Sequence, residues 1–441
     1  MKVSFHLQTN PGTSLGPAAF SSPLQTLEKG GVSRCRFVEE TDWVIAEDEL
    51  RLDGSPSPSL QLFEKAGPRE KLYFDPPRTT AAIVTCGGLC PGLNDVIRSL
   101  FMGLHYNYGV GKVLGIRNGY LGMNSNAGPA PLELTAEYVE AIHHSGGTVL
   151  GTSRGEQPLH EMVDFLVKQQ VDILFCVGGD GTQRCAAALV QEIAAHGLNK
   201  SVIGIPKTID NDLAYCDRSF GVVSAVEKAH EVVNQAHTEA KSAVRGIGLV
   251  KVMGRDAGFI ACGAALASQE ANYVLIPEVS FQLRGENGLL PHLQRRMADR
   301  KHAVIVVAEG AGQDLFQNAP MVRDKSGNIK KYDIGLFLKQ EIAAYFEELH
   351  EPVDIKYIDP SYIVRSVPAD SDDRILCDQL ARHAAHAALA GKTDIVICYK
   401  NNNFIHVPIP LVVSKKQQVN VNGELWAAVL ATTGQPARFE A

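Results

Sequence analysis

The sequence predicts an α/β fold of two Rossmann-like lobes with parallel sheets, preceded by an N-terminal extension. Three observations lead to this prediction. Short apolar runs alternate with longer runs of helical period, which is typical of a parallel sheet covered by helices. Turns rich in glycine or charged residues follow many of the apolar runs, at the edge where such sheets bind ligands. A chain of 441 residues is also long for a single hydrophobic core.

The first predicted lobe spans residues 79–218, and its strands are short apolar runs that end in polar or glycine-rich turns. The predicted strands are Ala81–Thr85, Val113–Ile116, Thr148–Leu150, Ile173–Val177 and Val202–Ile205. The predicted helices are Asp95–His105, His160–Gln169 and Arg184–His196. A further helix at Asp373–Leu389 and a strand at Ile395–Tyr399 are predicted near the end of the chain.

A second set of alternating units, residues 219–365, predicts the second lobe. Its predicted strands are Gly246–Val252, Tyr273–Ile276, Ala303–Ala308 and Ile355–Ile358. Its predicted helices are Phe220–Ser242, a run after Arg255 that extends through Ser268, and Asp333–Glu348. Residues 1–78 form the predicted extension, with a linker signal at Gly54–Ser59 and short strands at Cys35–Phe37 and Trp43–Ala46. Residues 411–441 are a C-terminal tail without a clear pattern.

The composition is that of an ordinary globular protein, with 45% hydrophobic and 21% charged residues. A formal net charge of −7 gives no reason to expect nucleic acid or an anionic membrane as a partner. Nine scattered cysteines without a CxxC pair indicate reduced thiols, and no apolar run is long enough to span a bilayer. Because Met1–Pro11 also lacks the apolar core of a secretory signal, we expect a cytoplasmic protein.

Two short stretches, each directly after an apolar run, carry the residues suited to chemistry. They are Gly178-Gly179-Asp180-Gly181-Thr182 and Pro206-Lys207-Thr208-Ile209-Asp210-Asn211-Asp212. Glycines let a backbone approach a ligand closely, and free amides at a helix N-terminus favour an anion. Asp180 can hold a magnesium ion that accompanies a phosphate, or it can cap the following helix. The second stretch offers a general base for phosphoryl transfer, or an Asx-rich turn without chemistry.

Together with five further stretches in the same order, this chain resembles the phosphofructokinase family. The five are Gly87–Asn94, Thr152-Ser153-Arg154-Gly155, Met253-Gly254-Arg255, Ala308-Glu309-Gly310 and Tyr362-Ile363-Val364-Arg365. The glycine-rich stretch alone is not specific, since NAD kinases and lipid kinases carry a similar run. The resemblance covers about residues 80–410 and is nearest to the long-chain ATP-dependent enzymes of trypanosomatids and plants. It implies that residues 366–410 complete the first lobe and that the protein is a homodimer or homotetramer.

The resemblance implies an ATP site on the first lobe, with Mg²⁺ as the cofactor and Asp180 as its ligand. The residues expected at this site are Gly88, Arg154, Gly155, Gly179, Asp180, Gly181 and Thr182. Arg154 can neutralise donor phosphate through its guanidinium group, although a lone arginine is as often a solvated surface residue.

The resemblance also implies a fructose 6-phosphate site between the lobes. The residues expected there are Thr208, Ile209, Asp210, Met253, Gly254, Arg255, Glu309, Lys356, Tyr362 and Arg365. Asp210 is expected to take the proton of the sugar 1-hydroxyl, while Thr208 and Arg255 contact the transferring phosphoryl group. Lys356, Tyr362 and Arg365 are expected to face the 6-phosphate. Many relatives reach a neighbouring subunit's 6-phosphate with an arginine where this chain has Gly246, one residue after Arg245, so this contact stays an open question.

Two residues give opposite indications of the phosphate donor. Gly181 favours ATP, since pyrophosphate users typically have an aspartate there that fills the space. Lys207 is typical of pyrophosphate users, although trypanosomatid and plant relatives combine this glycine and lysine and use ATP. Cys185 stands near a position that is often glycine, where a side chain crowds the adenosine. The sequence therefore predicts an ATP-dependent 6-phosphofructokinase, with a pyrophosphate-dependent enzyme as the first alternative and a non-catalytic phosphosugar or nucleotide sensor as the second.

Overall fold

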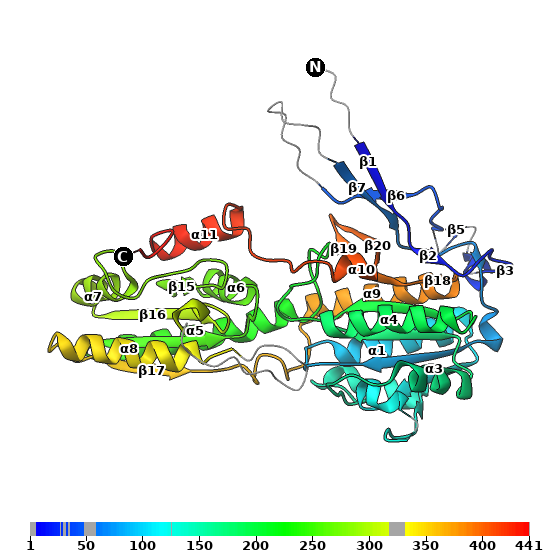
Figure 1. Cartoon of the computed structure of the whole chain (residues 1–441), viewed down its shortest axis with the longest axis horizontal. Coiled ribbons are helices and arrows are strands. Elements are labelled where there is room, and N and C mark those ends of the chain that lie inside the picture. The colour runs from blue at the N-terminus through cyan, green and yellow to red at the C-terminus, as the bar shows by residue number, and fades with distance from the viewer. Residues whose placement is uncertain are drawn as a thin grey trace, which may run out of the picture. The chain divides into compact units, whose positions relative to one another are not determined.

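The computed structural model describes residues 6–26, 28–29, 32–33, 36–47, 59–124, 126–316 and 331–440. They fall into two compact units, each with its own main sheet (Figure 1). Unit 1 comprises residues 1–208, 213–221 and 368–415, and unit 2 comprises residues 209–212, 222–367 and 416–441. The predicted α/β class is confirmed. The linker predicted from Gly54 onward and the start of the strand predicted at Cys35 lie outside the described residues.

The main sheet of unit 1 has the strand order β1-β7-β20-β19-β13-β12-β9-β10-β11, with β6 also paired to β7. The strands are β1 (His6–Asn10), β6 (Trp43–Ile45), β7 (Ser59–Lys65), β9 (Thr80–Thr85), β10 (Lys112–Ile116), β11 (Leu132–Glu133), β12 (Ile173–Gly178), β13 (Ser201–Pro206), β19 (Ile395–Lys400) and β20 (Asn403–Pro408). Strands β10, β9, β12, β13 and β19 are parallel, so the turns that follow β9, β12 and β13 lie at the same edge of the sheet. The segment before residue 79 continues this sheet through β1, β6 and β7.

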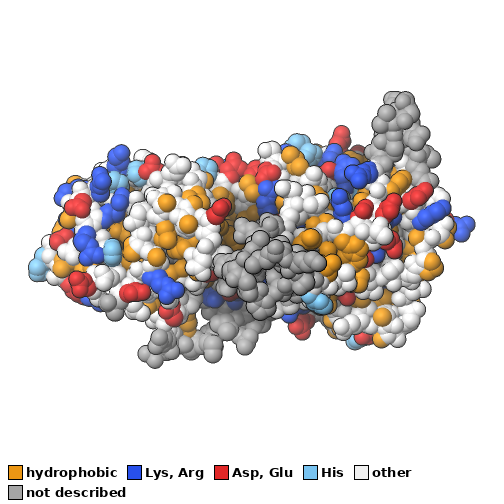
Figure 2. Space-filling model, turned by 90° about the horizontal axis from the view of Figure 1, so that it is seen from above, with side chains coloured by type: hydrophobic (Ala, Val, Ile, Leu, Met, Phe, Trp, Pro, Cys, Tyr) orange, Lys and Arg blue, Asp and Glu red, His pale blue; other side chains and the backbone are white. Residues whose placement is uncertain are grey.

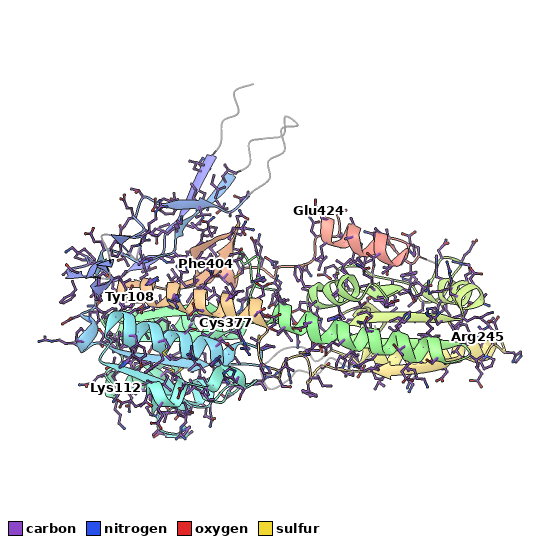
Figure 3. The ribbon with its side chains drawn as sticks, turned by 180° about the vertical axis from the view of Figure 1, so that it is seen from behind. Tyr108, Lys112, Arg245, Cys377, Phe404 and Glu424 are labelled. Atoms are coloured by element: carbon purple, nitrogen blue, oxygen red, sulfur yellow. The ribbon has the colours of Figure 1, made fainter. Side chains whose placement is uncertain are left out.

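The helices of unit 1 cover both faces of its sheet. They are α1 (Leu93–Met102), α2 (Ala136–Val139), α3 (Leu159–Lys168), α4 (Asp180–Ala195), α9 (Ser371–Leu389) and α10 (Ile409–Val412). Helices α3 and α4 bury their apolar stripes against alternate residues of β9, β12 and β13. On the opposite face α1 packs against α9, as a comparison of Figures 1 and 3 shows. Contacts beside the two ends of α1 add to this packing: Tyr108 Oη, in the turn after α1, lies 2.6 Å from His386 Nδ1, and the thiol of Cys377 donates to the carbonyl of Gly92, the N-cap of α1 (Figure 3).

Short elements connect the main ones. The two-residue strand pairs are β2 (Thr13–Ser14) with β18 (Lys392–Thr393), β3 (Phe20–Ser21) with β8 (Lys71–Leu72), and β4 (Glu28–Lys29) with β5 (Val32–Ser33). The 3₁₀ turns are η1 (Pro23–Thr26), η2 (Pro76–Arg78), η4 (Gly119–Met123), η5 (Ile142–His144) and η6 (Gln313–Phe316), and α1 continues as a π-helical turn, η3 (Gly103–Tyr108).

The strand predicted at Thr148–Leu150 is wrong, because this segment forms a turn. The backbone N–H of Val149 donates to the side chain of Asn94, and that of Leu150 donates to the hydroxyl of Thr148. The carbonyl of Thr148 accepts from Gly151 within the turn. Since side chains and the turn itself use these groups, no strand ladder forms.

Unit 2 contains a four-stranded parallel sheet in the order β15-β16-β14-β17. The strands are β14 (Gly246–Val252), β15 (Tyr273–Leu275), β16 (His302–Ala308) and β17 (Asp354–Ile358), and the helices are α5 (Val222–Ser242), α6 (Phe259–Ser268), α7 (Leu289–Arg300), α8 (Ile334–Glu348) and α11 (Glu424–Thr433). The two faces of β14 differ in residue size. Ile247 and Leu249 pack into the core under α7 and α8. On the other face a Cβ at Gly248 would lie 2.9 Å from the Ala236 carbonyl oxygen of α5, so this glycine lets the helix approach closely.

Candidate active site

In unit 1, two of the predicted turns meet at the carboxyl edge of the sheet. The backbone of Gly87 donates to the carbonyl of Ser153 at 3.3 Å, and the hydroxyl of Thr152 donates to the carbonyl of Gly87 at 2.7 Å. These bonds bring Arg154 and Gly155 beside the Gly87–Gly88 turn. Arg154 is exposed, and Gly155 has a φ of 103°, which favours glycine. The structure thus brings the Gly88 and Arg154 stretches together, as expected.

Helix α4 begins at Asp180, four residues earlier than the sequence predicted. Gly179 is extended and its carbonyl accepts the first helical bond, from Gln183, so Asp180, Gly181 and Thr182 form the first turn. The first amides of a helix have no partner within it, and with the helix dipole they favour an anion. A Cβ at Gly178 would overlap the side chain of Thr182, which explains the glycine that ends β12.

Gly181 and Asp180 differ in their surroundings. A Cβ built on Gly181 meets no atom within 4 Å, so a side chain there would enter open space in front of the helix. The carboxylate of Asp180 is paired with Arg184, whose Nε lies 3.0 Å from Oδ2. Arg184 also donates to the carbonyl of Val413. A metal ion on Asp180 would therefore compete with Arg184 for the carboxylate.

Lys207 joins the end of β13 to the glycine turn after β9. Its side chain is buried, and Nζ donates to the carbonyl of Gly88 at 2.6 Å. Its backbone N–H donates to the carbonyl of Gly178 at 3.2 Å. Lys207 thus connects the turns that follow β9, β12 and β13, and it places a positive charge against the glycine turn.

Gln183 is a positioning residue that sequence reasoning missed. Its fully buried side-chain amide donates to the carbonyls of Cys176 at 3.2 Å, Gly178 at 3.0 Å and Ile205 at 3.4 Å. It therefore ties the ends of β12 and β13, from which both central stretches leave. The available signal was a glutamine directly after the glycine-rich stretch, where a helix begins. Once buried there, its amide group needs hydrogen-bond partners.

The stretch that carries Asp210 crosses between the units, because residues 209–212 belong to unit 2 and their neighbours to unit 1. Oδ2 of Asp210 accepts from the backbone N–H of Arg255 at 3.4 Å. Asn211 has a φ of 53°, in the left-handed region that asparagine tolerates better than most residues. This bend turns the chain between Asp210 and Asp212.

The pKa of Asp210 is raised to about 7. Burial is the largest cause, and the negative charges of Asp212 and Glu309 add to it, while the Arg255 N–H acts in the opposite direction. Burial disfavours the charged form of a carboxyl group, and nearby carboxylates disfavour it further. A carboxyl group that titrates near neutral pH is suited to act as a general base.

The Met253-Gly254-Arg255 and Glu309-Gly310 turns lie together at the carboxyl edge of the unit 2 sheet. Gly310 donates to the carbonyl of Gly254 at 3.0 Å, and Glu309 donates to the carbonyl of Val252 at 2.9 Å. Gly254 has a φ of 132°, and a Cβ there would lie 2.6 Å from the Ala257 carbonyl oxygen. Both glycines are thus required for the turns to touch.

Several positive charges surround the carboxyl group of Glu309 at this edge. Burial raises its pKa, and the positive charges of Arg255, Lys251 and Arg365 oppose that rise. The structure therefore brings together Arg255, Glu309, Arg365 and Asp210, four of the residues that the resemblance assigns to the sugar site. Met253 is half-buried beside them.

Residues 359–366 form a turn that we name the Tyr362 turn. The carbonyl of Pro360 accepts from Ile363 at 2.8 Å and from Val364 at 3.1 Å, and Val364 is fully buried as its anchor. Tyr362 is 75% exposed, and the Arg365 guanidinium lies 4.7 Å from the centre of its ring. The turn thus displays a phenol and a guanidinium as a stacked pair.

Lys356 is not brought to the Tyr362 turn. It lies within β17 opposite Gly248, and its ammonium group pairs with Asp354 at 2.9 Å. Among the described residues, no ion pair or hydrogen bond joins it to Tyr362 or Arg365. Arg245 lies at the amino end of β14, opposite to the end that carries Arg255, and pairs with Glu351 at 2.6 Å (Figure 3).

The C-terminal tail also holds the turn after Asp210, which the sequence did not predict. The ammonium group of Lys416 pairs with Asp212 at 2.5 Å. The backbone N–H of Gln417 donates to the carbonyl of Asp212 at 3.0 Å, and its side-chain amide donates to the carbonyl of Asn211 at 3.3 Å. Residues 416–417 thus fix the turn after Asp210 to unit 2.

The side chains at the start of α4 suit magnesium better than a metal that needs several protein ligands. No group of three His, Cys, Asp or Glu side chains gathers as a metal site in the part of the chain that the structure describes. Magnesium keeps several waters and takes one or two carboxylates plus phosphate oxygens, so Asp180 beside the amides of α4 fits it.

No helix among the described residues is long and apolar enough to cross a membrane. On the face in Figure 2, acidic and basic side chains are interspersed.

Comparisons with known proteins agree with this geometry. The family model described as phosphofructokinase matches residues 80–388. An ATP-dependent 6-phosphofructokinase of Amycolatopsis methanolica is 45% identical, over 100% of this chain and 97% of that protein. One of Trypanosoma brucei brucei is 43% identical, over 91% of this chain and 83% of that protein. The crystal structure of a pyrophosphate-dependent phosphofructokinase from Marinobacter aquaeolei has a TM-score of 0.67 at 19% identity, over 82% of this chain and 93% of that chain, which bears on the fold alone. The chain belongs to the phosphofructokinase family.

Proposed function

We propose that this protein is an ATP-dependent 6-phosphofructokinase. It transfers the γ-phosphoryl group of ATP to the 1-hydroxyl of D-fructose 6-phosphate and so yields fructose 1,6-bisphosphate and ADP. The observation that carries the proposal is Asp210, whose carboxyl group has a pKa of about 7 among Arg255, Glu309 and Asp212. The relatives from Amycolatopsis methanolica and Trypanosoma brucei brucei, both called ATP-dependent 6-phosphofructokinase, support the choice of substrates.

The donor binds at the carboxyl edge of the unit 1 sheet. Its phosphates take the first amides of α4 at Gly181 and Thr182, the glycine turn at Gly88 and the guanidinium of Arg154. Asp180 holds Mg²⁺, which when bound supplies positive charge to the donor phosphates. Lys207 holds the glycine turn in place through the Gly88 carbonyl.

The acceptor binds at the carboxyl edge of the unit 2 sheet. Tyr362 and Arg365 take the 6-phosphate, since a guanidinium group and a phenol both donate hydrogen bonds to phosphate oxygens. Glu309 accepts hydrogen bonds from sugar hydroxyls, and Met253 and Gly254 pack along the sugar. Lys356 pairs with Asp354 within the chain, so we assign the 6-phosphate to Tyr362 and Arg365.

The reaction is a direct transfer. Oδ1 or Oδ2 of Asp210 takes the proton of the 1-hydroxyl as the hydroxyl oxygen attacks the γ-phosphorus. The bond from phosphorus to the ADP oxygen breaks in line with this attack, so no phosphoenzyme forms. Thr208, Arg255 and Lys207 supply a hydroxyl group and two positive charges that offset the charge on the transferring group.

Three observations in unit 1 favour ATP over pyrophosphate. Open space surrounds the Gly181 position, so nothing there stands in the way of a nucleotide. Lys207, the residue typical of pyrophosphate users, has a structural partner in Gly88. Cys185 is partly buried and packs against the core beneath α4, which favours room for an adenosine.

The test is product formation from fructose 6-phosphate and Mg²⁺, with ATP in one reaction and pyrophosphate in another. Turnover with ATP alone supports the proposal. Turnover with pyrophosphate alone refutes the donor and leaves the acceptor site intact, whereas tight ligand binding without turnover supports a sensor. Asp210→Ser should lower turnover by roughly two or more orders of magnitude, the usual contribution of a general base. We also propose that the protein is cytoplasmic and forms a homo-oligomer. Size-exclusion chromatography with light scattering tests the oligomeric state.

A further inference from the structure

Lys251 is a buried lysine inside the central strand of unit 2, two residues before Met253. Its side chain is 10% exposed, and its Nζ lies 2.9 Å from Oδ2 of Asp333 and 2.8 Å from Oδ2 of Asp359. Buried charges are costly unless they are paired, so this arrangement needs both carboxylates. The other residues of β14 are apolar or glycine.

One of the two carboxylates begins the Tyr362 turn. Oδ1 of Asp359 accepts hydrogen bonds from the backbone N–H and the hydroxyl of Ser361. The hydroxyl of Ser366 closes the other side of the turn by donating to the carbonyl of Tyr362 at 2.5 Å. The orientation of the Tyr362 turn therefore depends on where Asp359 is held.

The other carboxylate belongs to a rigid element. Oδ1 of Asp333 caps α8 by accepting from the backbone N–H of Leu336 at 3.0 Å, and the phenol of Tyr357 lies 3.4 Å away. Since β14 and α8 are both packed into the unit 2 core, the position of Lys251 is fixed on the side of Asp333. On the other side its only carboxylate partner among the described residues is the one that starts the turn.

We propose that Lys251 is a positioning residue for the acceptor site, holding Asp359 and thereby the Tyr362 turn where Tyr362 and Arg365 receive the phosphate of the sugar. The inference rests on the proposed function, and it adds a residue that makes no contact with substrate itself. Lys251 also adds positive charge behind Glu309, which attracts the anionic sugar phosphate.

Electrostatics within the cluster agrees with this role. Burial acts to raise the pKa of Asp359, but the hydrogen bonds from Lys251 and Ser361 outweigh it, so that pKa lies below its ordinary value. Without Lys251, two carboxylates would remain beside a site for a phosphate dianion. Both the loss of position and the excess negative charge weaken binding of the sugar phosphate and leave the ATP site in unit 1 untouched.

The test separates sugar-phosphate binding from turnover and from folding. Lys251→Met keeps the length of the side chain and removes its charge. It should raise KM for fructose 6-phosphate by about tenfold or more, with kcat within about threefold and KM for ATP within about twofold, since small displacements of binding groups have effects of this size. Titration calorimetry with fructose 6-phosphate alone should show the same weakening without turnover.

Two matched variants test whether the effect is specific. Asp333→Asn keeps an oxygen to cap α8 but weakens the partner that holds Lys251 on its fixed side, so it should raise KM for fructose 6-phosphate in the same direction as Lys251→Met and by less. Lys392→Met removes another buried lysine, paired with Glu64 in unit 1 at 3.0 Å, and should leave this KM unchanged. If Lys392→Met raises KM as Lys251→Met does, general destabilisation explains the effect and the inference is overturned.

A double-mutant cycle completes the test. Asp359→Asn should raise KM for fructose 6-phosphate as Lys251→Met does, and the double variant should be no worse than either single variant, because both act through one contact. Additive effects on KM would overturn the inference. If Lys251→Met does not fold, the raised KM of Asp359→Asn for fructose 6-phosphate tests the inference in its place. A wild type without turnover on fructose 6-phosphate refutes the proposed function, whereas an active wild type with an unaltered KM in both variants refutes only the role of Lys251.

Discussion

Replacing Asp210 by asparagine should remove activity and stabilise the fold, and the stabilisation should grow with pH. Asparagine keeps the shape of the side chain and the oxygen that accepts from Arg255, but it cannot take a proton. The wild-type carboxyl group has a pKa of about 7 in the fold and 3.8 as its ordinary value, chiefly because it is buried. Between these two pH values the folded state keeps a proton that the unfolded state has released. The free energy of unfolding of the wild type therefore falls as pH rises from about 4 to about 7.

The size of the effect follows from the two pKa values. Ionisation of Asp210 costs at most about 1.7 kcal/mol of folding free energy at pH 5 and at most about 4 kcal/mol at pH 8. Asparagine carries no such cost at either pH. The free energy of unfolding of Asp210→Asn, relative to wild type, should thus increase by about 1 to 2.5 kcal/mol between pH 5 and pH 8.

Urea denaturation at both pH values, without ligands and with a chelator present, measures this difference. Asp164→Asn is the matched control, because Asp164 is exposed on α3, and it should show the same difference from wild type at both pH values. A difference for Asp210→Asn that stays constant or shrinks with pH would refute the raised pKa. Turnover of Asp210→Asn within tenfold of wild type would refute its role as the general base, for which a loss of about a hundredfold or more is expected.

Three further substitutions test other parts of the site. Gly181→Asp should leave the melting temperature nearly unchanged, because its Cβ meets no atom within 4 Å, and should lower kcat/KM for ATP by roughly 10- to 1000-fold, as like charges about 4 Å apart repel by about 1 to 4 kcal/mol; unchanged use of ATP would contradict it. Gln183→Met should lower the free energy of unfolding by about 1 to 3 kcal/mol, since three buried carbonyls lose a donor, and should raise KM for ATP more than KM for the sugar; denaturation and steady-state kinetics check both. Lys416→Ala removes a positive charge from Asp212, whose negative charge acts on Asp210, so the pH at which kcat/KM rises to half its maximum should increase by about half a unit or more, and a shift to lower pH would contradict this expectation.

The sheets and the turns at their carboxyl edges were predictable from the sequence for a physical reason. Strands buried on both faces are continuous apolar runs, and β9, β12, β13, β14 and β16 were recognised in this way. Glycines after such runs mark turns where backbones approach one another. Gly178, Gly254 and Gly310 are required by contacts of this kind, which the sequence could suggest but not specify.

The residues that hold the site in place were not predictable in the same way. Lys251 and Asp333 are 82 residues apart in the chain, and Lys416 and Asp212 are 204 residues apart. Nothing local indicates such pairs, since a lysine in a tail is usually a solvated surface residue. Lys251 did leave one signal: a charged residue in an otherwise apolar strand needs a buried partner. The prediction for Lys356 shows the opposite case, in which the family resemblance grouped it with Tyr362 and Arg365 but the structure pairs it with Asp354.

The assignment of residues 209–212 to unit 2 has a chemical consequence. Thr208 and Leu213 on either side belong to unit 1, yet the bonds from Arg255, Lys416 and Gln417 hold the base and its turn to the residues of the acceptor edge. Under the proposed function Asp210 is therefore held beside the residues expected to bind the sugar, whereas the turns expected to bind the phosphate donor are tied together separately by Gln183 and Lys207. A general base acts only within hydrogen-bond reach of its proton. Anchoring it to the acceptor residues keeps that distance short, while its burial there among Asp212 and Glu309 raises its pKa to the value that proton transfer near neutral pH requires.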